Sequence, residues 1–304
     1  MSLTRHVLHQ GPLLNISCIC CRPDGKACGA EEHAAADTLA LPLNGVFIKH
    51  HGGGGPEVVA ASGQGLFFNT GEPYQVSHPA GGGDDCLALE LAPALQRELL
   101  GRYDAAAAER ERNPFTATHA ALPANLMLQR QLLWRALRAD TMDALEVEER
   151  ALQLFGAVLG SSRPLGRSAV DARPQARRRR AEQARAAAVA LAARPEENWS
   201  LDALSRRVHS SPFHLARSFR GELGEPVHQY LLRLRLAQAL ETVLDSGEAL
   251  TDIALRLGFA TPSHFTAAFR RSYGLTPSAL RRQVTVPAVR ELRKISTARG
   301  SAAA

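Results

Sequence analysis

Two short stretches of this chain repeat one another fifty residues apart. Residues 210–224 are SSPFHLARSFRGELG, and residues 260–274 are ATPSHFTAAFRRSYG. In each copy a serine or threonine stands directly before a proline, which is typical of a helix cap followed by the first helical residue. The sequence therefore predicts the same short helix twice. The identical positions are Pro212/Pro262, His214/His264, Phe219/Phe269, Arg220/Arg270 and Gly224/Gly274.

A shorter helix is predicted before each copy. The stretch SLDALSRRV starts at Ser200 and TDIALRLG starts at Thr251, and each ends in a turn of a few residues. A helix, a short turn and a second helix form a helix-turn-helix unit. We therefore expect two such units, with two ordinary α-hairpins of a helical bundle as the alternative. The spacing of fifty continues through Asp202/Asp252 and Arg206/Arg256.

One long helix is predicted between the copies. Residues 225–247, EPVHQYLLRLRLAQALETVLDSG, carry apolar residues at helical spacing without a break before Gly247. A helix of about twenty residues spans roughly 30 Å, and helices that bind one face of a DNA duplex lie about 34 Å apart. This length predicts a spacer that places the two repeated helices in successive major grooves.

Residues 177–282 resemble the DNA-binding domain of the AraC/XylS family of bacterial transcription regulators. The resemblance covers about a third of the chain. It implies two helix-turn-helix units joined by one long helix, and transcription regulation with double-stranded DNA and RNA polymerase as partners. It leaves open whether the protein is an activator or a repressor. The residues that carry it most clearly are Gly258, Phe259, Phe265, Phe269, Gly274 and Pro277.

Helical phase separates buried from outward positions in the repeated helices. Residues that recur on one face are expected in the core, and these are Leu215, Phe219, Leu223, Phe265, Phe269 and Tyr273. The resemblance implies that other positions contact bases, and these are Arg207, Phe213, Ala216, Arg217, Ser263, Thr266 and Ala267.

The two copies offer different groups to bases. Arg217 is the strongest candidate for a base contact, because a guanidinium group can bridge O6 and N7 of guanine. Phe213 is expected to pack against thymine methyl groups, with a core role as the alternative. The second copy has the small residues Ser263 and Ala267 instead, unlike family members with large polar groups there. We therefore expect the first copy to discriminate more strongly between sequences.

The starts of both repeated helices suit phosphate groups, because free N–H groups and the positive end of the helix dipole lie there. For each histidine in these helices, a surface or structural role is the alternative. The run Arg177–Arg180 is interpreted as a solvated entry to the domain, with phosphate contact as the alternative. The residues expected at the DNA backbone are Ser211, His214, Arg220, Thr261, His264 and Arg270.

The N-terminal half is predicted to be β-rich and then helical. Between residues 38 and 93, short apolar runs are separated by turn residues, as in a small antiparallel barrel or sandwich. The family resemblance implies a cupin-like effector domain with trailing helices, which gives an α+β fold. The expected boundaries are 1–162 for this domain, 163–176 for a linker, 177–283 for the DNA-binding domain and 284–304 for a flexible tail.

The trailing helices also suggest a dimer. The stretch LMLQRQLLWRAL places apolar side chains along one stripe. This stripe fits contact with a second copy of the chain, or packing on the chain's own barrel. We expect a homodimer, and the residues of the stripe are Leu126, Leu133, Trp134 and Leu137.

Five cysteines lie in the N-terminal half, four of them within eleven residues. Thiolates and imidazole suit zinc or copper(I), and thiols of low pKa sense oxidants, although the spacing matches no zinc motif. Buried small apolar residues are the alternative role. For the domain as a whole, the alternatives are a metal or redox signal, an organic effector, or none. The candidate metal or redox residues are Cys18, Cys20, Cys21, Cys28, His33 and Cys86.

Charge is distributed unevenly along the chain. Residues 1–170 carry 14 Arg and Lys against 18 Asp and Glu, whereas residues 171–304 carry 22 against 12. The basic C-terminal part indicates a polyanion partner, with a solubilising surface as the alternative. The sequence has no run of 18 apolar residues and no apolar N-terminal leader, so we expect a cytoplasmic protein without a membrane partner.

The rival functions belong to other classes. A cupin-type metalloenzyme and a DNA-repair methyl acceptor fused to a DNA-binding domain are the enzymatic alternatives. No Ser-His-Asp, Cys-His or phosphate-loop pattern is present, and the adjacent His50 and His51 point to opposite sides of any strand. We therefore expect a regulator rather than an enzyme. A non-specific architectural DNA binder is the third alternative.

Overall fold

The computed structural model describes residues 2–25, 28–52, 55–103, 110, 112–162 and 174–285. The chain forms two compact units, the first made of Met1–Arg194 and Trp199–Leu231 and the second of Pro195–Asn198 and Leu232–Ala304. The expected linker 163–176 lies outside the described residues except for its last three positions, and the expected tail 284–304 except for its first two. The ranges of the four predicted segments stay predictions.

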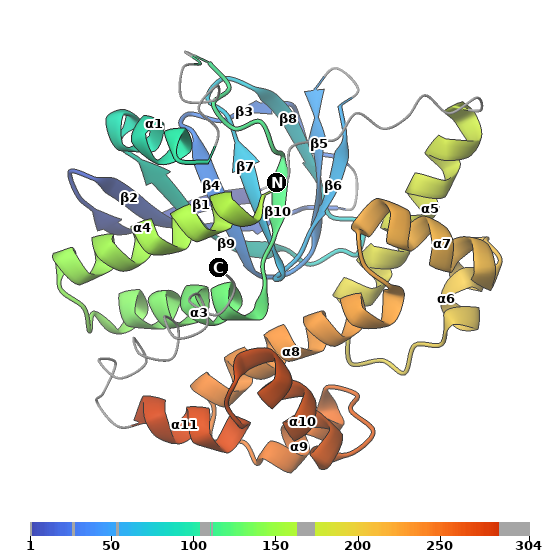
Figure 1. The fold of residues 1–304 in the computed structure, drawn as a ribbon. Helices are drawn as coiled ribbons and strands as arrows, with labels where there is room; N and C mark the ends of the chain where they lie inside the picture. Colours follow the sequence, from blue (N-terminus) through green and yellow to red (C-terminus); the bar gives the residue numbers. More distant parts are fainter. Residues whose placement is uncertain are drawn as a thin grey trace. The chain divides into compact units, whose positions relative to one another are not determined.

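Two antiparallel sheets form the β part of the first unit (Figure 1). One has six strands in the order β1 (Ser2–Gln10), β2 (Leu14–Arg22), β9 (Asp84–Leu91), β4 (Thr38–Asn44), β7 (Gln64–Phe68) and β10 (His119–Ala121). The other has four in the order β3 (Glu32–His33), β8 (Pro73–Ser77), β5 (Phe47–His51) and β6 (Glu57–Ala60).

The two sheets share one apolar core. Phe47 and Val58 of the four-stranded sheet belong to the same buried cluster as Leu66 and Cys86 of the six-stranded sheet. Side chains from both inner faces therefore fill the space between the sheets. The predicted α+β class is confirmed, and the cupin-like assignment of the β part stays a prediction.

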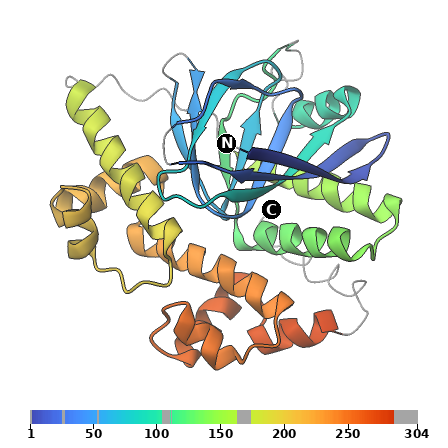
Figure 2. The same cartoon turned by 180° about the vertical axis from the view of Figure 1, so that it is seen from behind.

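The β region begins earlier than the sequence predicted. Strands β1 and β2 precede residue 38 and form a long antiparallel pair along one side of the six-stranded sheet, as Figure 2 shows. Strand β1 is an edge strand whose side chains are mostly exposed, including Leu3 and Val7. Exposure on both faces removes the alternation of apolar and polar residues that identifies a half-buried strand.

The strands are followed by α1 (Pro93–Gly101), α3 (Ala124–Ala139) and α4 (Ala144–Ser161). Helix α4 packs closely on strand β7. A Cβ atom at Gly65 of β7 would lie only 3.2 Å from the Val158 side chain of α4. Helix α3 is tied to the β part by Arg130, which is 2% exposed and donates to the carbonyl oxygens of Pro42 and Ser62. The helices predicted after residue 93 are confirmed for α1, α3 and α4, whereas strand β10 lies between α1 and α3, where no strand was predicted.

The stripe proposed for dimer contact lies partly inside the first unit. Leu126 and Leu133 are 3% and 1% exposed, and Trp134 and Leu137 are half-buried. The two buried leucines therefore pack on the chain's own fold and offer no surface to a second copy. The homodimer itself stays a prediction.

The rest of the described chain is helical: α5 (Pro174–Ala193), α6 (Leu201–Arg207), α7 (Pro212–Leu223), α8 (Val227–Asp245), α9 (Leu250–Arg256), α10 (Pro262–Tyr273) and α11 (Pro277–Thr285). The predicted helix-turn-helix units are α6–α7 and α9–α10, and the predicted long helix is α8. No described helix has the length and apolar character needed to cross a membrane.

Candidate nucleic-acid interface

The repeated serine or threonine of each copy caps a helix. The Ser211 hydroxyl accepts a hydrogen bond from the backbone N–H of His214 at 3.3 Å. The Thr261 hydroxyl accepts the equivalent bond from His264 at 3.1 Å. A proline occupies the first turn of both helices. The caps predicted from the sequence are therefore confirmed.

The repeated glycine ends each helix. Gly224 and Gly274 have φ values of 78° and 81°, in the left-handed region that side chains with a Cβ atom avoid. Their N–H groups donate to the carbonyl oxygens of Arg220 at 3.0 Å and Arg270 at 2.8 Å. Both helices thus end on the same left-handed cap, which gives a physical reason for the glycine in each copy.

The first helices of the two units align at a spacing of 49, not fifty. Helix α6 follows its cap Ser200, whereas α9 begins at Leu250 after Ala249, which has no capping side chain. The predicted start of α9 at Thr251 is wrong. Residues 208–211 separate α6 from α7 and residues 257–261 separate α9 from α10, so the second turn is one residue longer. Arg207, not Arg206, therefore corresponds to Arg256.

The inner face of each repeated helix is buried as predicted. Leu215, Phe219, Phe265 and Phe269 have no exposed side-chain area, and Tyr273 is 6% exposed. Leu223, expected in the same core, is only half-buried because it lies in the last turn of α7. Burial of one face fixes which residues each helix presents outward.

The outward face of α7 carries Phe213, Arg217 and Arg220. Phe213 is 71% exposed, which excludes the alternative of a core residue, and both arginines are exposed. Ala216 is half-buried and lines a hollow beside Leu204. An apolar ring and two guanidinium groups therefore stand together on one surface of α7.

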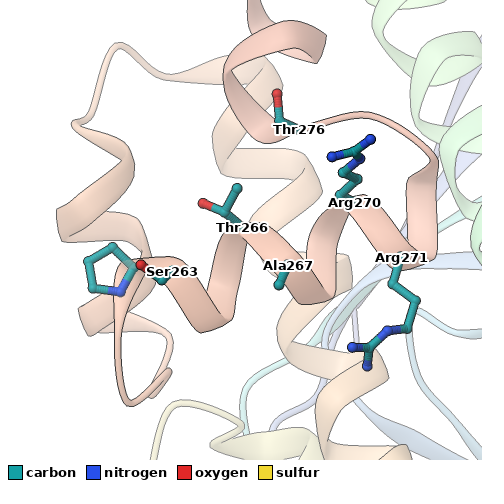
Figure 3. A pocket seen from close by; sticks show the side chains of 7 residues that line it. Ser263, Thr266, Ala267, Arg270, Arg271 and Thr276 are labelled. Atoms are coloured by element: carbon teal, nitrogen blue, oxygen red, sulfur yellow. The ribbon is translucent and has the colours of Figure 1, made fainter.

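The outward face of α10 carries smaller side chains than the outward face of α7. Figure 3 shows Ser263, Thr266, Ala267 and Arg270 along this face, which lines an open surface hollow. The sequence interpretation missed that Arg271 and Thr276 line the same hollow. The signal for Arg271 was its place next to Arg270 in the last, basic turn of the helix.

The arginines on these two outward faces differ from neighbouring arginines in having no ion pair with a described carboxylate. Arg206 pairs with Asp202 at 2.8 Å, and Arg256 pairs with Glu248 at 2.8 Å. Among the residues that the structure describes, none of the four arginines on the outward faces has a carboxylate within ion-pairing distance. Their positive charge is therefore available to an external anion, and they are Arg217, Arg220, Arg270 and Arg271.

Arg207 lies at the end of α6, beside the start of α7. Its side chain is exposed, and its guanidinium lies over the Trp199 ring at 6.0 Å from the ring centroid. Stacking on an aromatic ring restricts a long side chain that is otherwise free to rotate. His214 and His264 are both exposed, and His264 also packs its ring against Phe259 at 5.8 Å.

The structure does not bring the six candidate metal or redox residues together. The Sγ atoms of Cys18 and Cys20 lie 3.7 Å apart, whereas Cys28 and His33 are exposed. Cys86 donates its thiol hydrogen to Asp84. All five cysteines are free thiols. The described part of the chain therefore contains no single site formed by all six residues.

Burial raises the pKa of all five cysteine thiols. The pKa reaches about 12 for Cys20 and about 11 for Cys21, mainly through desolvation. Desolvation also raises the pKa of Cys18, Cys28 and Cys86. A thiol that reacts readily with oxidants needs a lowered pKa. The raised pKa values do not favour a redox role for these thiols, and the redox assignment stays a prediction.

Residues 204–283 match the family model of a helix-turn-helix domain. The chain is similar to the transcriptional regulator MtrA of Neisseria gonorrhoeae, with 27% identity over 90 residues, 30% of this chain and 30% of that protein. It is also similar to the activator RhaS of Escherichia coli O139:H28, with 36% identity over 86 residues, 28% of this chain and 30% of RhaS.

A third relative combines two activities in its name. The bifunctional transcriptional activator and DNA repair enzyme AdaA of Bacillus subtilis is 29% identical over 85 residues, 28% of this chain and 40% of AdaA. The chain spans about a third of the length of these curated relatives. Residues 204–283 of this chain are therefore a helix-turn-helix domain of the AraC type.

Proposed function

We propose that this protein is a sequence-specific DNA-binding transcription regulator controlled by its N-terminal β-rich region. The observation that carries the proposal is the pair of capped helices α7 and α10. Their outward faces hold exposed arginines that pair with no carboxylate of the described residues. Free guanidinium groups at helix surfaces bind phosphate oxygens and guanine edges. In the proposed complex α7 and α10 enter successive major grooves of one duplex.

The length of α8 supports this arrangement. Its 19 residues form one helix of about 28 Å at 1.5 Å per residue. This length is close to the separation of about 34 Å between neighbouring major grooves on one duplex face. In the proposal, base contacts come from Arg207, Phe213, Ala216, Arg217, Ser263, Thr266 and Ala267, and phosphate contacts come from Ser211, His214, Arg220, Thr261, His264 and Arg270.

The remaining parts of the proposal concern the whole protein. It acts in the cytoplasm as a homodimer, contacts RNA polymerase and carries no enzymatic activity. The family of residues 204–283 and the curated relatives support regulation of transcription. The N-terminal region supplies the effector response in this proposal, and a partly open pocket between its strands gives a place for a small effector.

We expect Arg217→Ala to weaken binding to a selected DNA site more than Thr266→Ala does. Loss of a guanidinium that contacts guanine costs about 1–3 kcal/mol, or about 5- to 150-fold in affinity. Loss of the Thr266 hydroxyl and methyl is expected to cost less than about threefold. Fluorescence anisotropy with the selected site and a scrambled duplex measures both effects.

The matched control is Arg206→Ala, which removes an arginine that is paired with Asp202. This variant is expected to bind the selected site with an affinity close to that of the unchanged protein. Equal losses of discrimination for Arg217→Ala and Thr266→Ala would contradict the proposed division of labour between the two units.

A further inference from the structure

Three side chains with different ligand atoms meet inside the β-rich region. Cys21 lies near the end of β2, His78 directly follows β8, and Asp84 begins β9. One sulfur, one imidazole nitrogen and one carboxylate oxygen lie within 4.8 Å of one another. The three residues are 5%, 1% and 4% exposed. Short-range sequence motifs could not reveal this group, because His78 and Asp84 lie 57 and 63 positions after Cys21.

The sheet register places these residues together. Cys21 and Asp84 are direct partners across the antiparallel pair β2–β9, so their side chains lie on the same face. A Cβ atom at position 83 would lie 2.1 Å from the carbonyl oxygen of Cys21. Gly83 therefore permits the close approach of the chain to β2 at this point. His78 completes the group, with its Nε2 atom 2.6 Å from Oδ1 of Asp84.

Two neighbours hold the group in place. The Cys86 thiol donates to Oδ2 of Asp84 at 3.3 Å, which leaves Oδ1 directed at His78. The Phe47 ring lies against the His78 imidazole with 6.0 Å between ring centroids. Outer groups that hydrogen-bond to a ligating carboxylate fix its orientation and strengthen metal binding. Cys86 occupies the position of such an outer group.

The ligand types suit zinc. Thiolate, imidazole and carboxylate bind Zn²⁺ at about 2.3, 2.0–2.1 and 2.0–2.2 Å. Tetrahedral geometry then requires about 3.3–3.6 Å between ligand atoms. The separation of 2.6 Å between His78 and Asp84 must therefore widen by about 0.7 Å when an ion enters.

A cavity adjoins the group. Cys21, Asp84 and Cys86 line a partly open pocket of about 310 Å³, together with apolar residues such as Phe47 and Phe68. Zinc sites with three protein ligands keep a fourth position open for water or a small molecule. We propose that Cys21, His78 and Asp84 bind one Zn²⁺-type divalent ion whose fourth coordination position opens into this cavity.

The proposed site differs from the cysteine cluster in the sequence. Side chains alternate along β2, so Cys18 and Cys20 lie on the opposite face from Cys21. Cys21 lines the cavity, and neither Cys18 nor Cys20 does. Cys28 is exposed, and its backbone forms an isolated β-bridge with Ser77. These three cysteines therefore serve as internal controls.

The test uses the full chain, freed of metal with a chelator and kept reduced. We expect it to bind one Co²⁺ per chain with a thiolate-to-cobalt charge-transfer band and the intense visible bands of tetrahedral Co²⁺. Zn²⁺ is expected to displace Co²⁺ and to raise the Tm. Cys21→Ser is expected to abolish the charge-transfer band, and His78→Ala to lower Co²⁺ affinity by at least about 100-fold.

Three further variants decide between this site and other cysteines. Cys20→Ser and Cys28→Ser are expected to keep the band and the affinity, whereas Cys86→Ala is expected to keep the band and lose about 10- to 100-fold in affinity. Circular dichroism checks that each variant folds. The proposal is overturned if the folded wild-type chain binds no ion, or if Cys20→Ser or Cys28→Ser removes the band while Cys21→Ser keeps it. Because the readout is metal binding, its failure leaves the proposed DNA binding unaffected.

Discussion

Phe269→Ala is expected to destabilise the second helix-turn-helix unit by about 3–5 kcal/mol, the usual cost of removing a buried aromatic ring. Phe269 has no exposed side-chain area and packs against Phe265 and Tyr273, with ring centroids 5.6 and 4.6 Å away. The cavity left in this small core removes the ring contacts that hold α10 against the rest of the unit. Hydrogen exchange of the full chain is expected to quicken in α10 by about two to four orders of magnitude.

The matched control is Arg270→Ala, one position further along α10 and exposed. It is expected to leave hydrogen exchange in α10 unchanged and to weaken DNA binding through the lost positive charge. Unchanged exchange in α10 for Phe269→Ala, with unchanged DNA affinity, would contradict the assigned core of the second unit.

Arg235→Met is expected to destabilise the second unit by about 2–4 kcal/mol, because three part-buried carbonyl groups lose a charged donor. Arg235 on α8 donates to three backbone carbonyl oxygens: Nε to Pro195 at 2.7 Å, Nη1 to Gly258 at 2.7 Å and Nη2 to Glu197 at 2.8 Å. Gly258 has a φ of 76° and lies in the turn before α10. Arg235 therefore holds the turn that sets the start of this helix.

Arg235→Lys is expected to recover less than half of this loss, because one ammonium group does not reach three carbonyls in the fork geometry of guanidinium. Arg282→Ala, which removes an exposed arginine, serves as the control for lost charge. Thermal unfolding of the full chain and hydrogen exchange in residues 257–273 measure the effect. An Arg235→Lys variant as stable as the unchanged protein would contradict the bridging role.

Local signals made the helix-turn-helix units predictable from the sequence. Ser211 and Thr261 form caps within three residues, and Gly224 and Gly274 end the helices through bonds four residues back. Interactions of such short range leave their pattern in consecutive residues. The spacing error at Thr251 arose because identical residues at an offset of fifty concealed a turn that is one residue longer in the second unit.

Long-range pairing made the β-rich region harder to predict. The group formed by Cys21, His78 and Asp84 depends on the register of β2 with β9, which no local pattern encodes. Strand β1 lies at a sheet edge and buries little, so its sequence lacks a period of two. The clustered cysteines suggested a shared site, yet strand alternation places their side chains on opposite faces of β2.

The most direct test of the central claim is selection of binding sites from random double-stranded DNA by the full chain. The proposed function predicts an enriched motif with two elements about 10 base pairs apart. It also predicts affinity for that motif at least about 10³-fold above that for a scrambled duplex at physiological salt. Selection that enriches no motif, or equal affinity for the selected and scrambled duplexes, would contradict sequence-specific recognition by α7 and α10.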